Sequence, residues 1–135
     1  MITDSTRGSV LLRRVLLADA IVSGVTGIAM MLGAEMLSPL FGVAAALLRW
    51  AGVSLMPFAA FVAAVAMRDS ISTAGVRVVI AANLLWAADS VLLLFTGWVD
   101  PTVLGYAFIV GQAILVAALA EVQHIGLKSA TLPGY

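Results

Sequence analysis

Four long apolar segments, each followed by a short polar stretch, make up almost the whole chain. They cover residues 15–34, about 44–67, 78–97 and 103–122. An α-helix rises about 1.5 Å per residue, so about 20 residues are needed to cross the roughly 30 Å hydrocarbon core of a bilayer. The pattern therefore predicts four transmembrane helices. The first segment is too long for the apolar core of a signal peptide, which favours a membrane span there as well.

Short connecting segments join the four predicted helices. Turn signals surround Pro39 after the first helix, a polar loop of residues 68–75 follows the second, and a tight turn at residues 98–101 follows the third. Loops this short force consecutive helices to lie antiparallel and side by side. The sequence therefore predicts an all-α, four-helix up-down bundle that forms a single membrane domain, residues 1–135. The first nine residues and the last ten are expected to be loose.

The composition agrees with a membrane protein and excludes several other classes. Hydrophobic residues make up 63% of the chain and charged residues only 10%, whereas about 25% of residues are charged in soluble domains. Seven basic and seven acidic residues are too few to cover a water-soluble fold or to keep a chain disordered. The formal net charge of zero gives no reason to expect a nucleic-acid partner. The lipid bilayer is the partner that the composition predicts.

The basic residues set the predicted orientation. All but Arg49 fall on the same side of the four-helix map: Arg7, Arg13, Arg14, Arg68, Arg77 and Lys128. Because basic residues stay on the cytoplasmic side of a membrane, both termini are expected in the cytoplasm. Aromatic residues that favour interfaces gather at the opposite side, at Trp50, Trp98 and Tyr106. We therefore expect an integral protein of a bacterial inner (plasma) membrane.

The residue types that hold metals and cofactors are scarce. The sequence contains no cysteine and one histidine, His124, so one chain offers neither a thiolate site nor a pair of histidines. Phosphate-binding loops and metalloprotease motifs are absent from the sequence as well. We expect neither a metal nor a cofactor.

Asp89 is the most informative polar residue inside a predicted span. It is the twelfth residue of its segment, about 18 Å from the inner edge, which is just past the middle of the membrane. An ionised carboxylate there costs several kcal/mol, so Asp89 should be paired or protonated. Two interpretations follow. Asp89 is either a protonated side chain that bonds to a neighbouring helix, or a proton site, a cation site or a ligand anchor.

The other helices place polar groups at the depth predicted for Asp89. Thr26 is the twelfth residue of the first span and Gln112 the tenth of the fourth. Pro57 in the second span leaves the carbonyl of Val53 without its helical donor, and a protonated Asp89 could supply one. The sequence thus predicts a central polar layer to which all four helices contribute.

A second polar layer is predicted nearer the cytoplasm. Counting from the segment ends puts Asp19 about 7 Å and Asn83 about 9 Å inside the membrane. Helical spacing lines up Asp19, Ser23, Thr26 and Met30 on one face, and Asn83, Trp86 and Ser90 on another. If these faces meet, they form a polar column suited to a proton relay or a solute cavity, or simply a satisfied helix contact. Alternatively, Asp19 pairs with Arg13 or Arg14.

Pairs of small residues mark faces where helices can approach closely. Ser23 with Gly27, and Ala60 with Ala64, have the small-xxx-small spacing of transmembrane helix contacts. These pairs serve packing inside the bundle or contact between chains. Arg49 is expected either to pair with Glu35 or to reach the outer headgroups.

Together these features favour a non-enzymatic protein. Asp19, Asp89 and His124 are predicted at three different depths, so they cannot form a catalytic group. We expect a subunit, a scaffold, or a bundle that binds a lipid, a pigment or another small ligand within a membrane assembly. The alternative is a minimal homo-oligomeric transporter that uses Asp89 and Asp19 as proton or cation sites. The expected protein partners are a second copy of the chain or other subunits of a larger complex.

Overall fold

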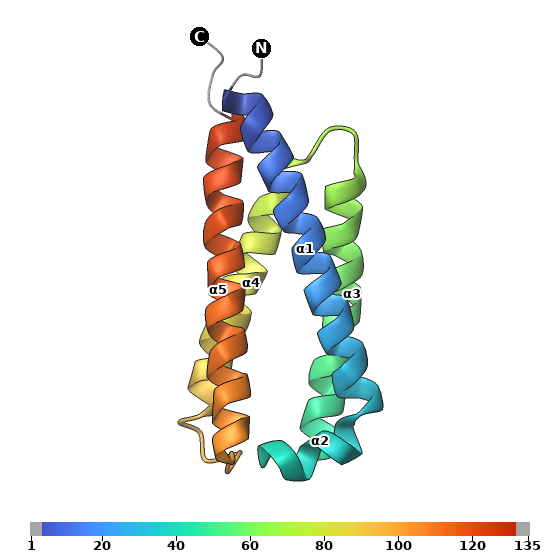
Figure 1. Cartoon of the computed structure of the whole chain (residues 1–135), viewed down its shortest axis with the longest axis vertical. Coiled ribbons are helices and arrows are strands. Elements are labelled where there is room, and N and C mark those ends of the chain that lie inside the picture. Colours follow the sequence, from blue (N-terminus) through green and yellow to red (C-terminus); the bar gives the residue numbers. More distant parts are fainter. Residues whose placement is uncertain (1–3, 132–135) are drawn as a thin grey trace.

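The computed structural model describes residues 4–131, and the side chains of residues 8–130 within them. The described chain is helical, without strands. Its elements are α1 (Asp4–Leu32), α2 (Ala34–Phe41), α3 (Ala45–Met67), α4 (Thr73–Leu93) and α5 (Val103–Thr131) (Figure 1). Four of them, α1, α3, α4 and α5, are long and apolar enough to cross a membrane. The predicted all-α fold with four membrane-spanning helices is therefore confirmed.

The four long helices run up and down in one bundle, but they do not pack evenly. α1 packs against α3 on one side and α5 on the other, and α4 packs against α5. α3 and α4 make few contacts, so this side of the bundle is the least tightly packed among neighbouring helices. Figure 1 shows the α1–α3 pair and the α4–α5 pair diverging towards the end that carries α2. We call this end the α2 end, and the end that carries Asp4 and Thr131 the terminal end.

The helix bounds differ from the predicted ones at several places. α4 begins at Thr73 because the Ser72 hydroxyl accepts a hydrogen bond from the backbone N–H of Gly75 (3.1 Å), which caps the helix. The helix ends at Leu93 rather than at residue 97. α5 continues to Thr131, where a loose tail was expected, and α1 begins already at Asp4. The side chain of Arg7 and residues 1–3 and 132–135 lie outside the described ones.

Packing explains why the tail is helical. A Cβ on Gly126 would lie 3.3 Å from Cα of Leu12, and one on Gly8 would lie 2.6 Å from the backbone nitrogen of Ala130. The two helices thus approach closely at both glycines, which buries the ends of α1 and α5 against each other. Helix stability in proteins comes mainly from such tertiary contacts.

The short helix α2 replaces the turn predicted around Pro39. It ends at Gly42, whose φ of 67° is left-handed and whose N–H bonds to the carbonyl of Ser38. α2 crosses the α2 end and contacts the start of α5 (Figure 1). There the Thr102 hydroxyl donates to the carbonyl oxygen of Leu40 (2.5 Å), and the rings of Phe41 and Phe108 stack 4.7 Å apart. α2 therefore bridges the two helix pairs at this end.

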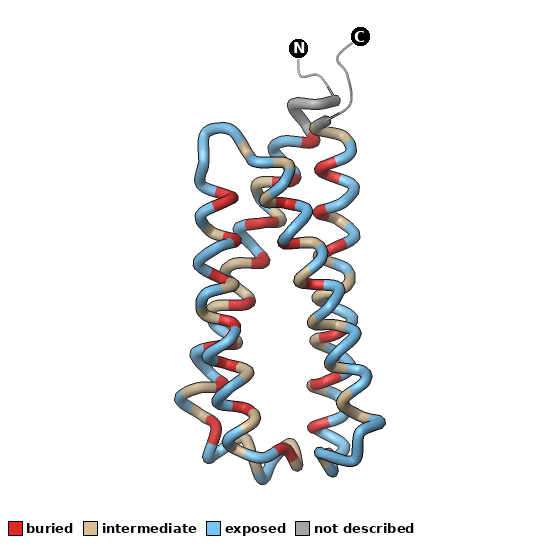
Figure 2. Tube along the Cα trace, turned by 180° about the vertical axis from the view of Figure 1, so that it is seen from behind, coloured by how far each residue is buried: buried red, intermediate tan, exposed pale blue. Residues whose placement is uncertain are grey.

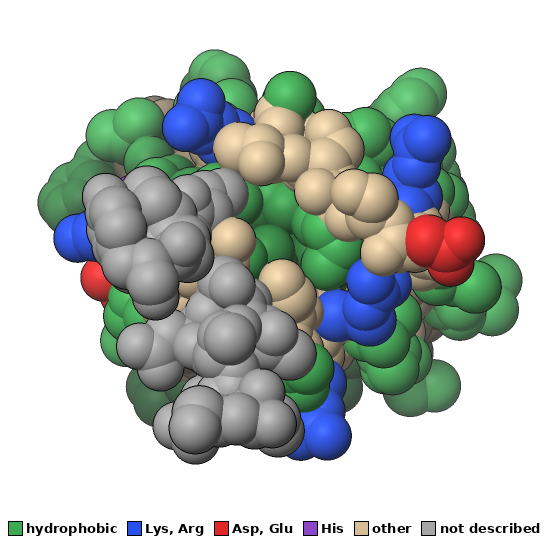
Figure 3. Space-filling view, turned by 90° about the horizontal axis from the view of Figure 1, so that it is seen from above, with side chains coloured by type: hydrophobic (Ala, Val, Ile, Leu, Met, Phe, Trp, Pro, Cys, Tyr) green, Lys and Arg blue, Asp and Glu red, His purple; other side chains and the backbone are tan. Residues whose placement is uncertain are grey.

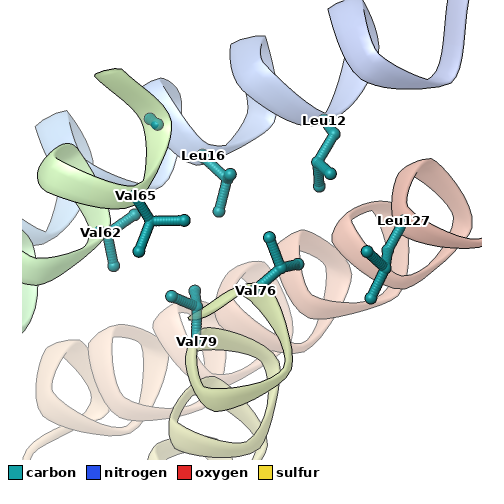
Figure 4. Packing of buried hydrophobic residues seen from close by; sticks show 8 residues of the cluster. Leu12, Leu16, Val62, Val65, Val76, Val79 and Leu127 are labelled. Carbon is teal, nitrogen blue, oxygen red and sulfur yellow. The ribbon is translucent and has the colours of Figure 1, made fainter. Parts of the chain in front are cut away.

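The terminal end is filled by a tight apolar core. Buried side chains from all four long helices point toward one another there (Figure 4). They are Leu12, Leu16, Val62, Val65, Ala66, Val76, Val79 and Leu127. Arg13 reinforces this end because its guanidinium donates to the carbonyl oxygens of Ala66, Arg68 and Asp69 where α3 finishes. The described helices thus leave no polar path through the bundle at the terminal end.

The outside of the bundle is apolar, as a bilayer requires. Buried residues face the interior, while exposed ones cover the surface (Figure 2). Large apolar side chains such as Ile21 (65% exposed) and Leu32 (83% exposed) lie on this surface. Seen from the terminal end, Lys and Arg side chains lie around the rim (Figure 3). Arg49 lies at the α2 end, where it forms the expected ion pair with Glu35 (2.7 Å).

Candidate functional site

A cluster of four buried polar side chains lies inside the bundle. Asp19 and Ser23 come from α1, Asn83 from α4 and Gln123 from α5. Oδ2 of Asp19 accepts from Nδ2 of Asn83 and from Nε2 of Gln123, each over 2.7 Å. The Ser23 hydroxyl donates to Oδ1 (3.1 Å), and Asn83 also donates to Oε1 of Gln123 (3.1 Å). We call these four residues the Asp19 cluster.

The Asp19 cluster is internally satisfied. In the described part of the chain, every buried side-chain nitrogen or oxygen has a hydrogen-bond partner. Asp19 acts only as an acceptor, and its partners are neutral. The alternative pairing with Arg13 is wrong, because that side chain bonds to the carbonyls at the end of α3 instead. Asn83 and Asp19 also link α1 and α4, whose backbones do not approach each other. The cluster therefore holds three helices together across the bundle.

Asp19 and Asn83 lie near the middle of their helices. Asp19 is about 17 Å from Gly8 and about 20 Å from Leu32 along α1, and Asn83 is about 15 Å from either end of α4. Gln123 lies nearer the terminal end of α5, about 12 Å from Thr131. The predicted depth of Asp19 was counted from residue 15, whereas the apolar part of α1 begins at Gly8.

Asp89 lies elsewhere than predicted. α4 begins five residues earlier and ends four residues earlier than the predicted span, so Asp89 is about 6 Å from the α2 end of its helix and not near the middle. The expected hydrogen bond to the carbonyl of Val53 is not among those of the described residues, since α3 and α4 hardly touch. The side chain of Asp89 is exposed.

A cavity that we call the larger cavity lies at this level. Its volume is about 400 Å³, and residues from α1, α3, α4 and α5 line it. Thr26, Asp89 and Gln112 share its wall, so the structure brings these three predicted residues together around one space. The rest of the wall is mainly apolar and includes Ala51 and Phe108. A volume of this size suits a small organic molecule.

A smaller cavity of about 180 Å³ adjoins the larger one. Both are lined by Thr26, Trp86, Phe108 and Gln112. Ser23 and Asn83 also line the smaller cavity, so the Asp19 cluster borders it. Part of the predicted polar column therefore exists as a row of polar side chains along two neighbouring cavities.

The wall of the larger cavity includes side chains from α3 and α4, two helices that make few contacts with each other. The apolar core fills the terminal end, and α2 bridges the opposite end.

Polar groups on the wall bond mostly to one another. Nε1 of Trp86 donates to Oε1 of Gln112 (2.8 Å), and Nε2 of Gln112 donates to the carbonyl of Ile109 (2.9 Å). The Ser90 hydroxyl donates to the carbonyl of Trp86 (2.7 Å). These bonds hold Trp86 and Gln112 together across the α4–α5 contact. Among the described residues of the wall, Asp89 is the one with an ionisable side chain.

Gln123 was missed in the sequence because the fourth predicted span ended at residue 122. Its spacing from Gln112 was the available signal. Eleven residues are just over three full helical turns, so both side chains project from the same face of α5. In the structure, each bonds to a polar side chain of α4: Gln112 to Trp86, and Gln123 to Asn83.

The predicted small-residue pairs have different surroundings. A Cβ on Gly27 would lie 3.0 Å from the carbonyl oxygen of Gly52, so α1 and α3 touch backbone to backbone there. Ser23 belongs to the Asp19 cluster. Ala60 and Ala64 are exposed on the outer face of α3. The first pair therefore packs inside the bundle, whereas the second is turned towards the surroundings of the protein.

Comparisons with models of protein families, with characterised proteins and with solved structures find no match to this chain. The class of protein therefore follows from its own fold and site. Its four apolar helices are those of a small helical membrane protein with a polar cluster and a cavity inside the bundle.

Proposed function

We propose that this protein is a non-enzymatic membrane protein that binds a small apolar or amphiphilic molecule between α3 and α4. The observation that carries the proposal is the cavity of about 400 Å³ whose wall includes side chains of α3 and α4, two helices with little contact between them. A helix pair that packs poorly leaves apolar surface without partners, and a bound molecule of matching shape restores those contacts. Ligand sites of this kind are mostly apolar and have a few polar groups that orient the ligand.

The environment of the carboxylates supports a role without catalysis. A catalytic carboxylate needs a reacting partner or a base that orients it, and it needs access to substrate. Asp19 is buried and bonds to Ser23, Asn83 and Gln123. His124 is exposed on another face of α5, one residue beyond Gln123. We therefore propose that Asp19 has a structural role and that Asp89 contacts the ligand.

The outer face of α3 favours assembly with another chain. Ala60 and Ala64 are exposed at the spacing that lets transmembrane helices approach closely. We therefore propose that the protein forms a homo-oligomer or part of a larger membrane complex. We also propose an inner-membrane location with both termini in the cytoplasm, because of the distribution of the basic residues.

Transport is the second candidate, because one observation favours it. Polar residues continue from Asp89 along the two adjoining cavities to the Asp19 cluster. A transporter would have to open the apolar core at the terminal end. Uptake of a lipophilic cation into reconstituted vesicles, driven by a pH gradient and abolished by Asp89→Asn, would identify this activity.

Native mass spectrometry of the protein, extracted mildly from its own membrane, tests the binding function. We expect a bound small molecule on the wild type and its loss in Ala51→Phe, which fills the wall of the larger cavity. Ala46→Phe is the matched control, since it makes the same change at an exposed position of the same helix that lines neither cavity. Equal occupancy in all three proteins, or none in any, would contradict the proposal. The same spectra report the oligomeric state.

A further inference from the structure

We propose that the molecule bound in the larger cavity carries a positively charged group, such as an ammonium on an apolar body, and that this group pairs with Asp89. The inference rests on the proposed function and adds the chemical class of the ligand. Four features of the cavity carry it: an unpartnered carboxylate, wall donors that do not bond to this carboxylate, an excess of acidic residues at this end, and aromatic walls.

The carboxylate of Asp89 has no hydrogen-bond or ion-pair partner among the described residues, although it lines a cavity in a helix that crosses the membrane. Asp19 shows the contrast, since its oxygens accept three hydrogen bonds inside the same bundle. A carboxylate away from bulk water is stabilised by a partner that donates hydrogen bonds or carries positive charge. The protein supplies such partners to Asp19 and leaves Asp89, on the wall of the larger cavity, without one.

The neighbouring donors on the wall are engaged elsewhere. Trp86 donates to Gln112, and Ser90 donates to the carbonyl of Trp86. The Thr96 hydroxyl donates to the carbonyl of Leu93 (2.8 Å). None of these three groups donates to Asp89, and no hydrogen bond joins it to Thr26 or Trp98 on the same wall. The Asp89 carboxylate is therefore available to a donor or a positive charge on the ligand.

The charges at the α2 end favour a cation over a neutral donor. Among the described residues at this end, Glu35, Asp89 and Asp100 are acidic, and Arg49 is basic. The guanidinium of Arg49 is paired with Glu35 at 2.7 Å, so it is not available to Asp89. The negative field that remains attracts cations and disfavours anionic head groups.

The remaining walls suit an apolar cation. Trp86, Trp98 and Phe108 line the cavity, and aromatic rings attract positive charge through their π faces. Asp89 is about 6 Å from the end of α4, so a charged head group can reach it near the membrane surface. The smaller cavity continues the space towards the middle of the bundle, along Phe58 and Val116, and can take an apolar tail.

A pair of probes that differ only in charge tests this inference. Both contain an anthryl group on a short alkyl chain, which ends in trimethylammonium in one probe and in the isosteric tert-butyl group in the other. Binding to the protein in dodecyl maltoside micelles is followed by energy transfer from tryptophan to anthracene, since two tryptophans line the cavity. Neither the detergent nor the neutral probe contains an ammonium group.

We expect saturable binding of the cationic probe that is at least about tenfold tighter than that of the neutral probe. Asp89→Asn should remove this preference and leave the affinity for the neutral probe unchanged. Asp100→Asn is the matched control because it removes a carboxylate from the same end, in the exposed loop, and it should keep the preference. Ala51→Phe should block both probes.

The possible failures are distinguishable. Equal affinity for both probes, with both blocked by Ala51→Phe, would overturn the cation proposal and leave ligand binding standing. If neither probe binds saturably, the proposed function fails as well. The comparison of the two probes on the wild type decides the question even if Asp89→Asn does not fold.

An ammonium group has two natural sources, the head group of a membrane lipid and a free lipophilic amine. Adding phosphatidylethanolamine or phosphatidylglycerol to the micelles separates them, because the first lipid carries an ammonium group and the second does not. Competition by the first alone would identify a lipid head group as the ligand, and competition by neither would identify a free amine. Either conclusion holds only if the cationic probe binds about tenfold more tightly than the neutral probe.

Discussion

Replacing Asp19 with leucine is expected to lower the free energy of unfolding by about 2–4 kcal/mol. Asp19 accepts hydrogen bonds from Ser23, Asn83 and Gln123 in the interior of the bundle. Without it, Gln123 loses the acceptor of its amide N–H and Asn83 loses one of its two acceptors, and each such loss costs about 1–3 kcal/mol. The link between α1 and α4 is lost at the same time. Unfolding in mixed micelles of increasing sodium dodecyl sulfate content measures the change.

Two further variants show whether the effect comes from unsatisfied amides. Ser23→Ala removes one donor and leaves the rest of the Asp19 cluster paired, so it should cost only about 0.5–1 kcal/mol. Combining Asp19→Leu with Asn83→Leu and Gln123→Met removes the buried amides as well, and should recover most of the lost stability. If the combined variant were as unstable as Asp19→Leu, unsatisfied amides would not be the cause.

Introducing a single methyl group at Gly52 is expected to destabilise the bundle by about 1–3 kcal/mol. A Cβ there would lie 2.6 Å from the carbonyl oxygen of Gly27 and 2.9 Å from the backbone nitrogen of Met31. Both atoms belong to the backbone of α1, so no side-chain rotation relieves the contact. The helices would have to move apart along their closest contact. Thermal unfolding in detergent measures the loss.

Gly111→Ala is the control for Gly52→Ala. No heavy atom lies within 4 Å of a Cβ at Gly111 in the described chain. In the interior of α5, alanine should therefore stabilise the helix by up to about 1 kcal/mol relative to glycine. Equal effects of the two substitutions would show that backbone contact between α1 and α3 does not decide the outcome.

The sequence predicted the helices well because length and hydropathy are local properties. The four apolar segments correspond to α1, α3, α4 and α5. The bounds were harder, because caps and tertiary contacts decide them. Ser72 sets the start of α4, and contact with Gly8 and Leu12 keeps the last turns of α5 helical. α2 was missed because its eight residues are stabilised by contacts with the start of α5 rather than by their own pattern.

The candidate site was only partly predictable for the same reason. Helical spacing correctly put Asp19 and Asn83 on faces that meet, but depths counted from wrong helix ends moved Asp89 to the middle of the membrane. Gln123 fell just outside the predicted span. The gap between α3 and α4 follows from how the helix pairs diverge, and no local pattern in one sequence encodes it.

A ligand site between α3 and α4 is expected to open to the bilayer, which can be measured directly because the chain contains no native cysteine. Single cysteines replace Ser90 on the cavity wall, Val91 on the exposed surface and Val79 in the core of α4, and each is labelled with bimane. In bilayers with doxyl-labelled phosphatidylcholine, the probe at Ser90 should be quenched nearly as strongly as the one at Val91. Quenching as weak as that at Val79 would mean that α3 and α4 close over the cavity, and would contradict a ligand site open to the bilayer.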